Sequence, residues 1–546
     1  MPQTFSKLSD DQLNPVAGDS RLRIPEIEAW IGTLPLADVG ETYQRVFSAL
    51  LNINESDFPG QERFEALELF RRPIRYLSEA LKHQFIGAPF PLTHKAHGIA
   101  TQLRDLHMEM AKGYQIISDE LLALTTLRQD FKLLATSLYR SLYYLGQGLL
   151  TSYQIYEPGT NPVWRRIHRI YEAAERKGMQ SSVVKDDYLR SKPATSIEEQ
   201  YKQILLLALA NPYRYSQADM VSVYSLLEHW TRHCQLHPAD HPADRQYACL
   251  VDLAGDHGPS YIAYNTVPHP TTCRFLDTTA LIQLLLNSSP KSAKDTSNQT
   301  SGAEAPKKTT VTWKDLLQTL VTAWGLTTKR RFSRTRPEAT NIGVSLSLSA
   351  IHKVIDNPDS IHADQTAVAN IRSNISTARS AGVEGRVFSC EVINESADGW
   401  RLKWHNTNKG RIRVGELVAV HHTQDSGETS GIAVIRWLKN TGKHTVDFGI
   451  QLLTPNAIPI AIRHYGAKHP ESGHEYLKGL YIPEFKSTRQ PASLILPAFL
   501  YHADDIVSLI MDHEEHCLRL AKPVETTQGF SRFQFASMAV PQERRN

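Results

Sequence analysis

Two short polar segments hold the side chains of this sequence that are best suited to binding a phosphorylated ligand. The first segment is rich in cations and contains Lys329, Arg330, Arg331 and Arg334. Arginine binds phosphate through a planar fork of N–H groups, stacks on flat π-surfaces and pairs with guanine O6 and N7. Because Pro337 follows closely, we expect a loop that enters a strand. Such a loop can curl the arginines of an R-x-x-x-R spacing around a compact dianion.

The second segment has the pattern N-x-S-x-x-G and consists of Asn394, Ser396 and Gly399 with the residues between them. Short polar side chains at a strand end bond to nearby backbone and to the edges of a ligand. Gly399 can supply the positive φ of a tight turn. Taken alone, an arginine cluster is usually a solvated surface, and this pattern is usually a hairpin turn. Only the two motifs together, followed by strands, favour a binding site.

The sequence around the second motif predicts a small closed β-barrel. An alternation of apolar and small polar residues predicts a first strand over 344–350. Further strands are predicted over 386–392, 400–404 and 410–420, and as a hairpin over 431–439 and 444–453.

In this order, the two motifs and the strands resemble the PilZ domain, a β-barrel receptor for cyclic di-GMP. The V-x-R-W of 434–437 and the F-G-I-Q of 448–451 are similar to the closing hairpin of that family. The resemblance covers residues 328–465. Arg334 and Asn394 lie 60 residues apart, which is farther than usual for the family, so we interpret 352–385 as an insertion after the first strand.

The resemblance implies a bacterial receptor that regulates motility, pili, adhesion or exopolysaccharide, with no enzymatic activity, cofactor or metal. It implies that cyclic di-GMP contacts the polar residues of both motifs, namely Lys329, Arg330, Arg331, Arg334, Asn394, Ser396 and Gly399. The sequence agrees in lacking the phosphate-loop, nucleophile-elbow and dinucleotide-binding patterns of common enzymes.

The rest of the sequence predicts a multidomain α+β protein. Apolar residues at three- and four-residue spacings predict a helical domain over 1–240, either a solenoid-like scaffold for a protein partner or a plain bundle. Pro73 is expected to kink or split one of its helices. The other expected parts are a small α/β or β module over 244–286, a flexible linker over 287–310, a lead-in helix with the barrel over 311–465, and a C-terminal β domain over 466–546.

Composition narrows the function further. The 546 residues carry a net charge of +3 with 21% charged residues, which does not mark the whole chain as a nucleic-acid binder. No apolar run is long enough to predict a membrane span, and the first residues do not have the pattern of a secretory signal. Five scattered cysteines suit reduced thiols in a cytoplasm.

A histidine-rich segment suggests zinc at first sight. His229, His233 and His237 are spaced i, i+4, i+8, and Cys234 and His241 lie nearby. Prolines at 238 and 242 end the helix that would align them, and no second cysteine is close, so we expect no metal here.

Two alternatives to a cyclic di-GMP receptor remain open from the sequence. The barrel can be a degenerate copy that acts only as a protein-interaction scaffold. Less favoured is an RNA- or DNA-binding protein that uses the basic patch over 329–336, since only one aromatic residue interleaves with it.

Overall fold

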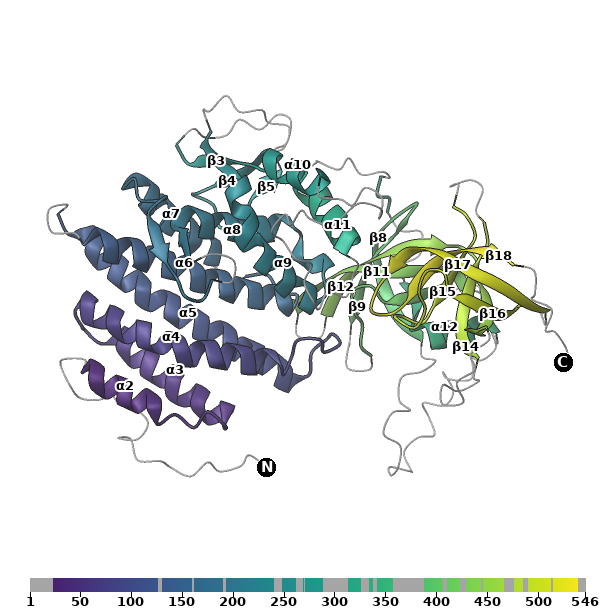
Figure 1. Cartoon of the computed structure of the whole chain (residues 1–546), viewed down its shortest axis with the longest axis horizontal. Helices are drawn as coiled ribbons and strands as arrows, with labels where there is room; N and C mark the ends of the chain where they lie inside the picture. The colour runs from purple at the N-terminus through teal and green to yellow at the C-terminus, as the bar shows by residue number, and fades with distance from the viewer. Residues whose placement is uncertain are drawn as a thin grey trace.

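The computed structural model shows a stack of helices joined at one end to two β-barrels (Figure 1). It describes residues 23–125, 130–159, 162–189, 193–239, 248–261, 269, 271–287, 313–325, 333–336, 341–356, 387–405, 410–422, 429–442, 445–465, 476–484, 490–511 and 514–538. The predicted α+β class, with a helical N-terminal half, a PilZ-like barrel and a C-terminal β domain, is confirmed. Of the linker predicted over 287–310, Asn287 is the last residue of a helix, and residues 288–310 lie outside the described part.

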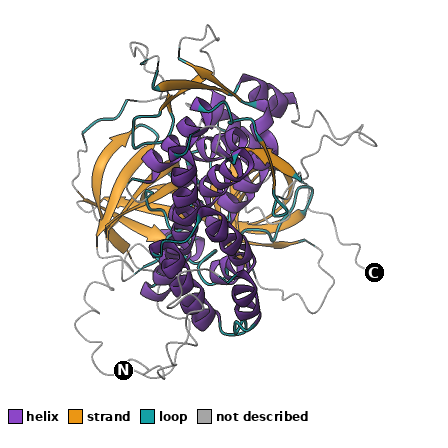
Figure 2. Cartoon of the chain, turned by 90° about the vertical axis from the view of Figure 1, so that its left-hand side faces the viewer, coloured by secondary structure: helices purple, strands orange, loops and turns teal. Residues whose placement is uncertain are grey.

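The helices of the N-terminal half lie side by side, and Figure 2 looks onto the end of this stack. Several begin at a side chain that accepts backbone N–H groups of the first turn, as Asp38, Thr93 and Asp130 do. The helices are α2 (Ile24–Gly32), α3 (Val39–Glu55), α4 (Gly60–Lys82), α5 (His94–Ala123), α6 (Phe131–Gln154), α7 (Val163–Arg176), α8 (Ile197–Leu209) and α9 (Gln217–Trp230).

Pro73 does not split its helix, because α4 runs without a break from Gly60 to Lys82. A proline inside a helix removes a backbone hydrogen bond and costs about 3 kcal/mol. Phe70, Ile74 and Leu77 on the same helix are at most 1% exposed. Burial of this face outweighs the local penalty, which the sequence pattern around one proline does not reveal.

A small sheet follows the helices and begins earlier than predicted. Its four strands lie in the order β3-β6-β4-β5, and β3 starts at Gln235, before the expected module over 244–286. The parts of this region are the 3-10 helices η2 (Pro212–Arg214) and η3 (Thr231–His233), the strands β3 (Gln235–Pro238), β4 (Ala248–Asp252), β5 (Ser260–Tyr261) and β6 (Cys273–Asp277), and the helix α10 (Thr279–Asn287).

The helix expected to lead into the barrel packs on the helical half. This helix, α11 (Trp313–Gly325), places the Trp324 ring edge-on against Trp230, with centroids 5.9 Å apart. The Trp324 indole also donates to the carbonyl of Leu206, at 3.0 Å. The helix is therefore part of the helical core. The predicted domain over 311–465 had grouped it with the barrel.

The first barrel closes in the order β7-β8-β9-β12-β11-β10, with β10 returning to pair with β7. Both predicted hairpins are present. The expected strand over 410–420 is wrong in its first half, since only the residues from Leu417 on are in the strand. The strands are β7 (Asn341–Leu346), β8 (Val387–Ser396), β9 (Gly399–His405), β10 (Leu417–His422), β11 (Thr429–Gly442) and β12 (Thr445–Thr454).

The first strand ends sooner than its alternating pattern predicted. Ser347 has a left-handed φ of 75°, and the chain then forms the helix α12 (Leu348–Asp356). Leu348 and Ile351 of this helix are buried among apolar residues of both barrels, including Val434 of the first and Phe530 of the second. Their tertiary contacts override the strand pattern. Of the proposed insertion, residues 357–385 lie outside the described part.

The C-terminal β domain is a second closed barrel, with the order β13-β14-β15-β18-β17-β16. Its first strand precedes residue 466, so the predicted boundary between the two barrels is placed too late. The strands are β13 (Ile458–His464), β14 (Leu477–Ile482), β15 (Ser493–Leu496), β16 (Ile506–Met511), β17 (Glu514–Thr526) and β18 (Ser531–Ser537).

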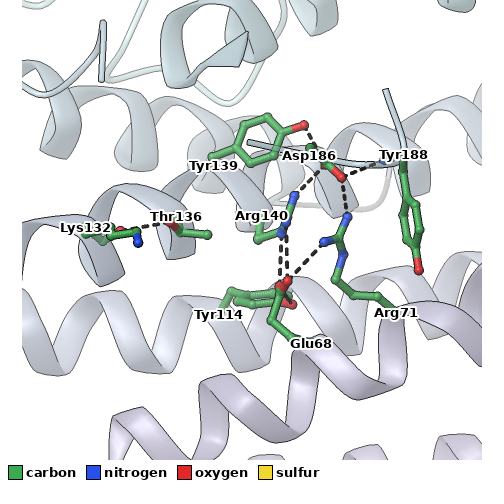
Figure 3. A network of polar contacts seen from close by, with 9 residues as sticks. All are labelled: Glu68, Arg71, Tyr114, Lys132, Thr136, Tyr139, Arg140, Asp186 and Tyr188. Carbon is green, nitrogen blue, oxygen red and sulfur yellow. Dashed lines mark hydrogen bonds and ion pairs between the residues drawn. The ribbon is translucent and has the colours of Figure 1, made fainter. Parts of the chain in front are cut away.

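A buried network of charges ties the helical half together (Figure 3). Asp186, which is 1% exposed, accepts hydrogen bonds from Arg71 of α4 and from Arg140 and Tyr139 of α6. Glu68 pairs with the same two arginines, 3.0 Å from each. Burial alone would raise the pKa of Asp186, and the two arginines outweigh it and hold that pKa below its ordinary value.

Glu416, just before β10, gives the first barrel a distinct pH dependence. Burial raises the pKa of its carboxyl to about 7, although the Arg413 N–H donates to it at 2.9 Å. Since this pKa lies above the unfolded value, the stabilisation is complete below about pH 4.5 and is lost as pH rises through 7.

We expect Glu416→Gln to match the wild type in free energy of unfolding at pH 4 and to exceed it by about 1–2 kcal/mol at pH 8. Glutamine stays neutral and can still accept the Arg413 N–H. Glu484→Gln, at an exposed glutamate, is the control and should show no pH-dependent difference. If Glu416→Gln differed from the wild type by the same free energy of unfolding at both pH values, the raised pKa of Glu416 would be contradicted.

Candidate ligand-binding site

The N-x-S-x-x-G motif forms the tight hairpin between β8 and β9. Ser396 pairs with Gly399 in the register, and Asn394 pairs with Arg401 after a bulge in β8. The Ser396 hydroxyl donates to the Asp398 carboxylate at 2.7 Å. A Cβ on Gly399 would lie 2.0 Å from the carbonyl oxygen of Ile450 on the neighbouring strand β12. Glycine is therefore required here because two backbones approach closely, in addition to its φ of 152°.

The described end of the arginine motif, residues 333–336, runs beside this hairpin although it lies far away in the sequence. Thr335 and Glu395 form an isolated antiparallel bridge, with N···O distances of 2.9 and 3.4 Å. In this antiparallel register Arg334 lies opposite Ser396, and both line one groove with Asn394. At these residues, the fold places the arginine motif close to the hairpin motif.

A groove of about 250 Å³ opens over the hairpin, a little smaller than the roughly 300–1,000 Å³ of typical small-molecule sites. The groove is lined by four of the predicted ligand residues, namely Arg334, Asn394, Ser396 and Gly399. Further residues of the β8–β9 turn, of β9, β11 and β12 and one residue of the helical half complete the lining. These further lining residues are Arg214, Asp398, Trp400, Arg401, Arg436, Trp437, Gly449, Ile450 and Gln451.

Carboxylates outside the groove hold two of its arginines in place. The Arg401 guanidinium lies 2.6 Å from the buried carboxylate of Asp447. Arg436 of β11 forms an ion pair with Glu525 of the second barrel and donates to Gln451 at 2.8 Å. With four arginines and one aspartate among its lining residues, the groove favours an anionic ligand.

Two tryptophans give the groove flat apolar surfaces. Trp400 of β9 and Trp437 of β11 are both partly exposed. A Cβ on Gly449 would lie 1.9 Å from the Trp437 indole nitrogen, so glycine in the F-G-I-Q segment lets this ring lie against β12. Indole faces next to arginines suit the bases of a nucleotide.

The structure brings together four of the seven residues expected to bind ligand, namely Arg334, Asn394, Ser396 and Gly399. Lys329, Arg330 and Arg331 lie outside the described residues, and their role stays a prediction. Sequence reasoning missed Arg401, Arg436, Trp437 and Gln451 as lining residues, although the last three stand in the V-x-R-W and F-G-I-Q segments. It also missed Arg214, for which the local sequence carries no signal.

The histidine-rich segment does not continue as one helix. Helix α9 ends at Trp230, and His237 lies in strand β3. The rings of His229 and His233 are 6.4 Å apart, and the Arg232 guanidinium contacts His229. Among the described residues no three potential metal ligands come together. His241 lies outside these residues, and the absence of a metal stays a prediction.

A six-stranded barrel that carries an arginine motif and an N-x-S-x-x-G hairpin on one groove defines a PilZ-type receptor domain. Residues 249–363 and 355–459 match a family model described as the cyclic-di-GMP receptor FimW, middle PilZ domain. Residues 25–241 match the N-terminal domain of this receptor, and residues 462–538 match the FimW C-terminal β-barrel domain. The chain belongs to this family of PilZ-containing cyclic di-GMP receptors, which confirms the resemblance found in the sequence.

One relative matches along nearly the whole chain. It is the protein named cyclic-di-GMP receptor FimW from Pseudomonas aeruginosa, 24% identical over 564 aligned positions, which cover 94% of this chain and 90% of the relative. No solved structure matches the chain.

Proposed function

We propose that this chain binds cyclic di-GMP in the groove over the β8–β9 hairpin and relays the signal to a protein partner through its helical half. The observation that carries the proposal is the bridge between Thr335 and Glu395, which brings Arg334 to the β8–β9 hairpin, where it lines one groove with Asn394 and Ser396. Two phosphates and two guanines match the arginines and tryptophans found there.

The proposed action is binding rather than catalysis. Among the groove-lining residues, the Ser396 hydroxyl donates to Asp398, and no histidine, lysine or cysteine stands beside it as a base or second nucleophile. The ligand would therefore be held and released unchanged. The proposal needs no cofactor and no metal.

We further propose that the receptor works in the cytoplasm, where the second messenger would reach it. All five cysteines are buried free thiols, as expected in a reducing compartment. Within the described residues, no helix has the length and apolar character needed to cross a membrane. The regulated process would be motility, pili, adhesion or exopolysaccharide.

Calorimetric titration of the full chain with cyclic di-GMP, GTP and a short RNA tests the proposal. We expect saturable binding of cyclic di-GMP alone, because only this ligand offers two phosphates and two guanines in a compact ring. Binding of RNA without cyclic di-GMP would favour the nucleic-acid alternative. If none of the three binds, the barrel is a degenerate copy and the chain acts as a ligand-independent scaffold.

A further inference from the structure

One cation of the groove comes from the helical half of the chain. Arg214, the last residue of η2, lines the groove together with Arg334, Asn394 and Ser396. It also lines a neighbouring cleft toward the second barrel, as Arg436 does. The groove therefore spans a junction between domains and is not confined to the first barrel.

The backbone that carries Arg214 is firmly fixed. Asn211 takes the left-handed conformation, with φ 56° and ψ 68°, and turns the chain out of α8 into Pro212. The Arg214 N–H donates to the Asn211 carbonyl at 3.0 Å. The next residue, Tyr215, is 5% exposed, and its carbonyl accepts a hydrogen bond from the Tyr156 hydroxyl at 3.1 Å. Little backbone ordering is therefore needed for Arg214 to meet a ligand.

The helical half is also docked onto the strand that carries Arg436. The Asn440 N–H of β11 donates to the carbonyl of Tyr156 at 2.8 Å, and its side chain donates to Glu157 at 3.1 Å. The Lys439 ammonium lies 5.6 Å from the centre of the Tyr213 ring. These contacts hold η2 against β11 and set the distance between Arg214 and the barrel arginines.

Within the described residues, the Arg214 guanidinium has no carboxylate partner. Its side chain is exposed. Arg401 and Arg436 differ, because each has a carboxylate partner. Arg214 would therefore pair with a phosphate of the ligand without first breaking an ion pair to a described carboxylate.

We propose that Arg214 is a ligand-binding residue, so that one cyclic dinucleotide contacts both the helical half and the barrel. This inference rests on the proposed binding of cyclic di-GMP. It gives the ligand a direct contact with η2, and thereby a physical route from the barrel into the helical half.

The test measures the affinity of the full chain for cyclic di-GMP by calorimetry in wild type, Arg214→Ala and Arg214→Lys. We expect Kd to rise about tenfold for alanine and less for lysine, which keeps the charge but not the planar fork. Arg72→Ala, at an exposed arginine of α4, is the matched control and should keep the wild-type Kd. Melting temperatures without ligand should be equal, because the Arg214 side chain is exposed and forms no ion pair with any carboxylate that the structure describes.

Hydrogen exchange separates a contact from a distant electrostatic effect. We expect cyclic di-GMP to slow exchange in residues 211–216 of the wild type but not of Arg214→Ala. An unchanged Kd for Arg214→Ala, or unchanged exchange of these residues in the wild type, overturns the inference while leaving the proposed function intact. If the wild type itself does not bind cyclic di-GMP, the proposed function and the inference both fail.

Discussion

Replacing Arg334 with alanine is expected to weaken the binding of cyclic di-GMP by roughly 10- to 150-fold, the range of a charge-assisted hydrogen bond worth about 1.5–3 kcal/mol. The bridge from Thr335 to Glu395 holds the backbone of Arg334 beside the hairpin motif, so its guanidinium would reach a ligand in the groove. Arg334→Lys should recover only part of the loss, because lysine lacks the planar fork. Calorimetric titration measures these differences.

Arg336→Ala is the matched control for this effect. Arg336 is an exposed arginine two residues away and is not among the residues that line the groove. Its loss changes the net charge equally and should leave Kd near the wild-type value. If both alanine variants lost the same affinity, binding would depend on general charge and not on Arg334. Arg330→Ala is expected to resemble Arg334→Ala, as the R-x-x-x-R spacing predicts.

Asp186→Ala is expected to lower the free energy of unfolding of the helical half by about 3–5 kcal/mol, because it leaves Arg71 and Arg140 buried without one of their two carboxylates. Both arginines are under 8% exposed, so water cannot replace the lost partner. Thermal or urea denaturation measures the loss. Asp186→Asn should be milder, since the amide still accepts hydrogen bonds.

Asp187→Ala controls for the position in the chain. Asp187 is exposed and adjacent to Asp186, and its removal should change stability by no more than about 0.5 kcal/mol. Because the pKa of Asp186 is held low, its contribution is present above the ordinary aspartate pKa of about 3.9 and is lost as pH falls below it. Similar stability of the Asp186 and Asp187 variants would show that the network contributes little.

The barrel hairpins could be predicted because their information is local. Apolar alternation on both sides of Gly399, and again around 440–442, fixes strand faces and turns within short windows. The position of Asn394, Ser396 and Gly399 on one tight hairpin was predictable for a similar reason, because it depends only on the strands that flank them. That these residues lie close to Arg334 could be predicted only from the resemblance to a known family.

Other features depend on partners that are distant in the sequence. Leu348 fits a strand pattern, yet it is buried in a helix against the second barrel. Pro73 would end an isolated helix, yet α4 continues through this residue because one face of the helix is buried. Arg214 follows an ordinary Asn-Pro break, and its place in the groove exists only because Tyr156 and Glu157 dock onto Asn440. No window of sequence contains both sides of that contact.

The apolar cluster around α12 limits how this chain can be divided. Leu348 and Ile351 lie in one buried apolar cluster with Ile432 and Val434 of the first barrel and Leu480 and Ile495 of the second. A fragment that contains only one of the barrels would expose its part of this apolar cluster to solvent, which favours aggregation. We therefore expect the two barrels to fold as one unit that cannot be separated without loss of stability.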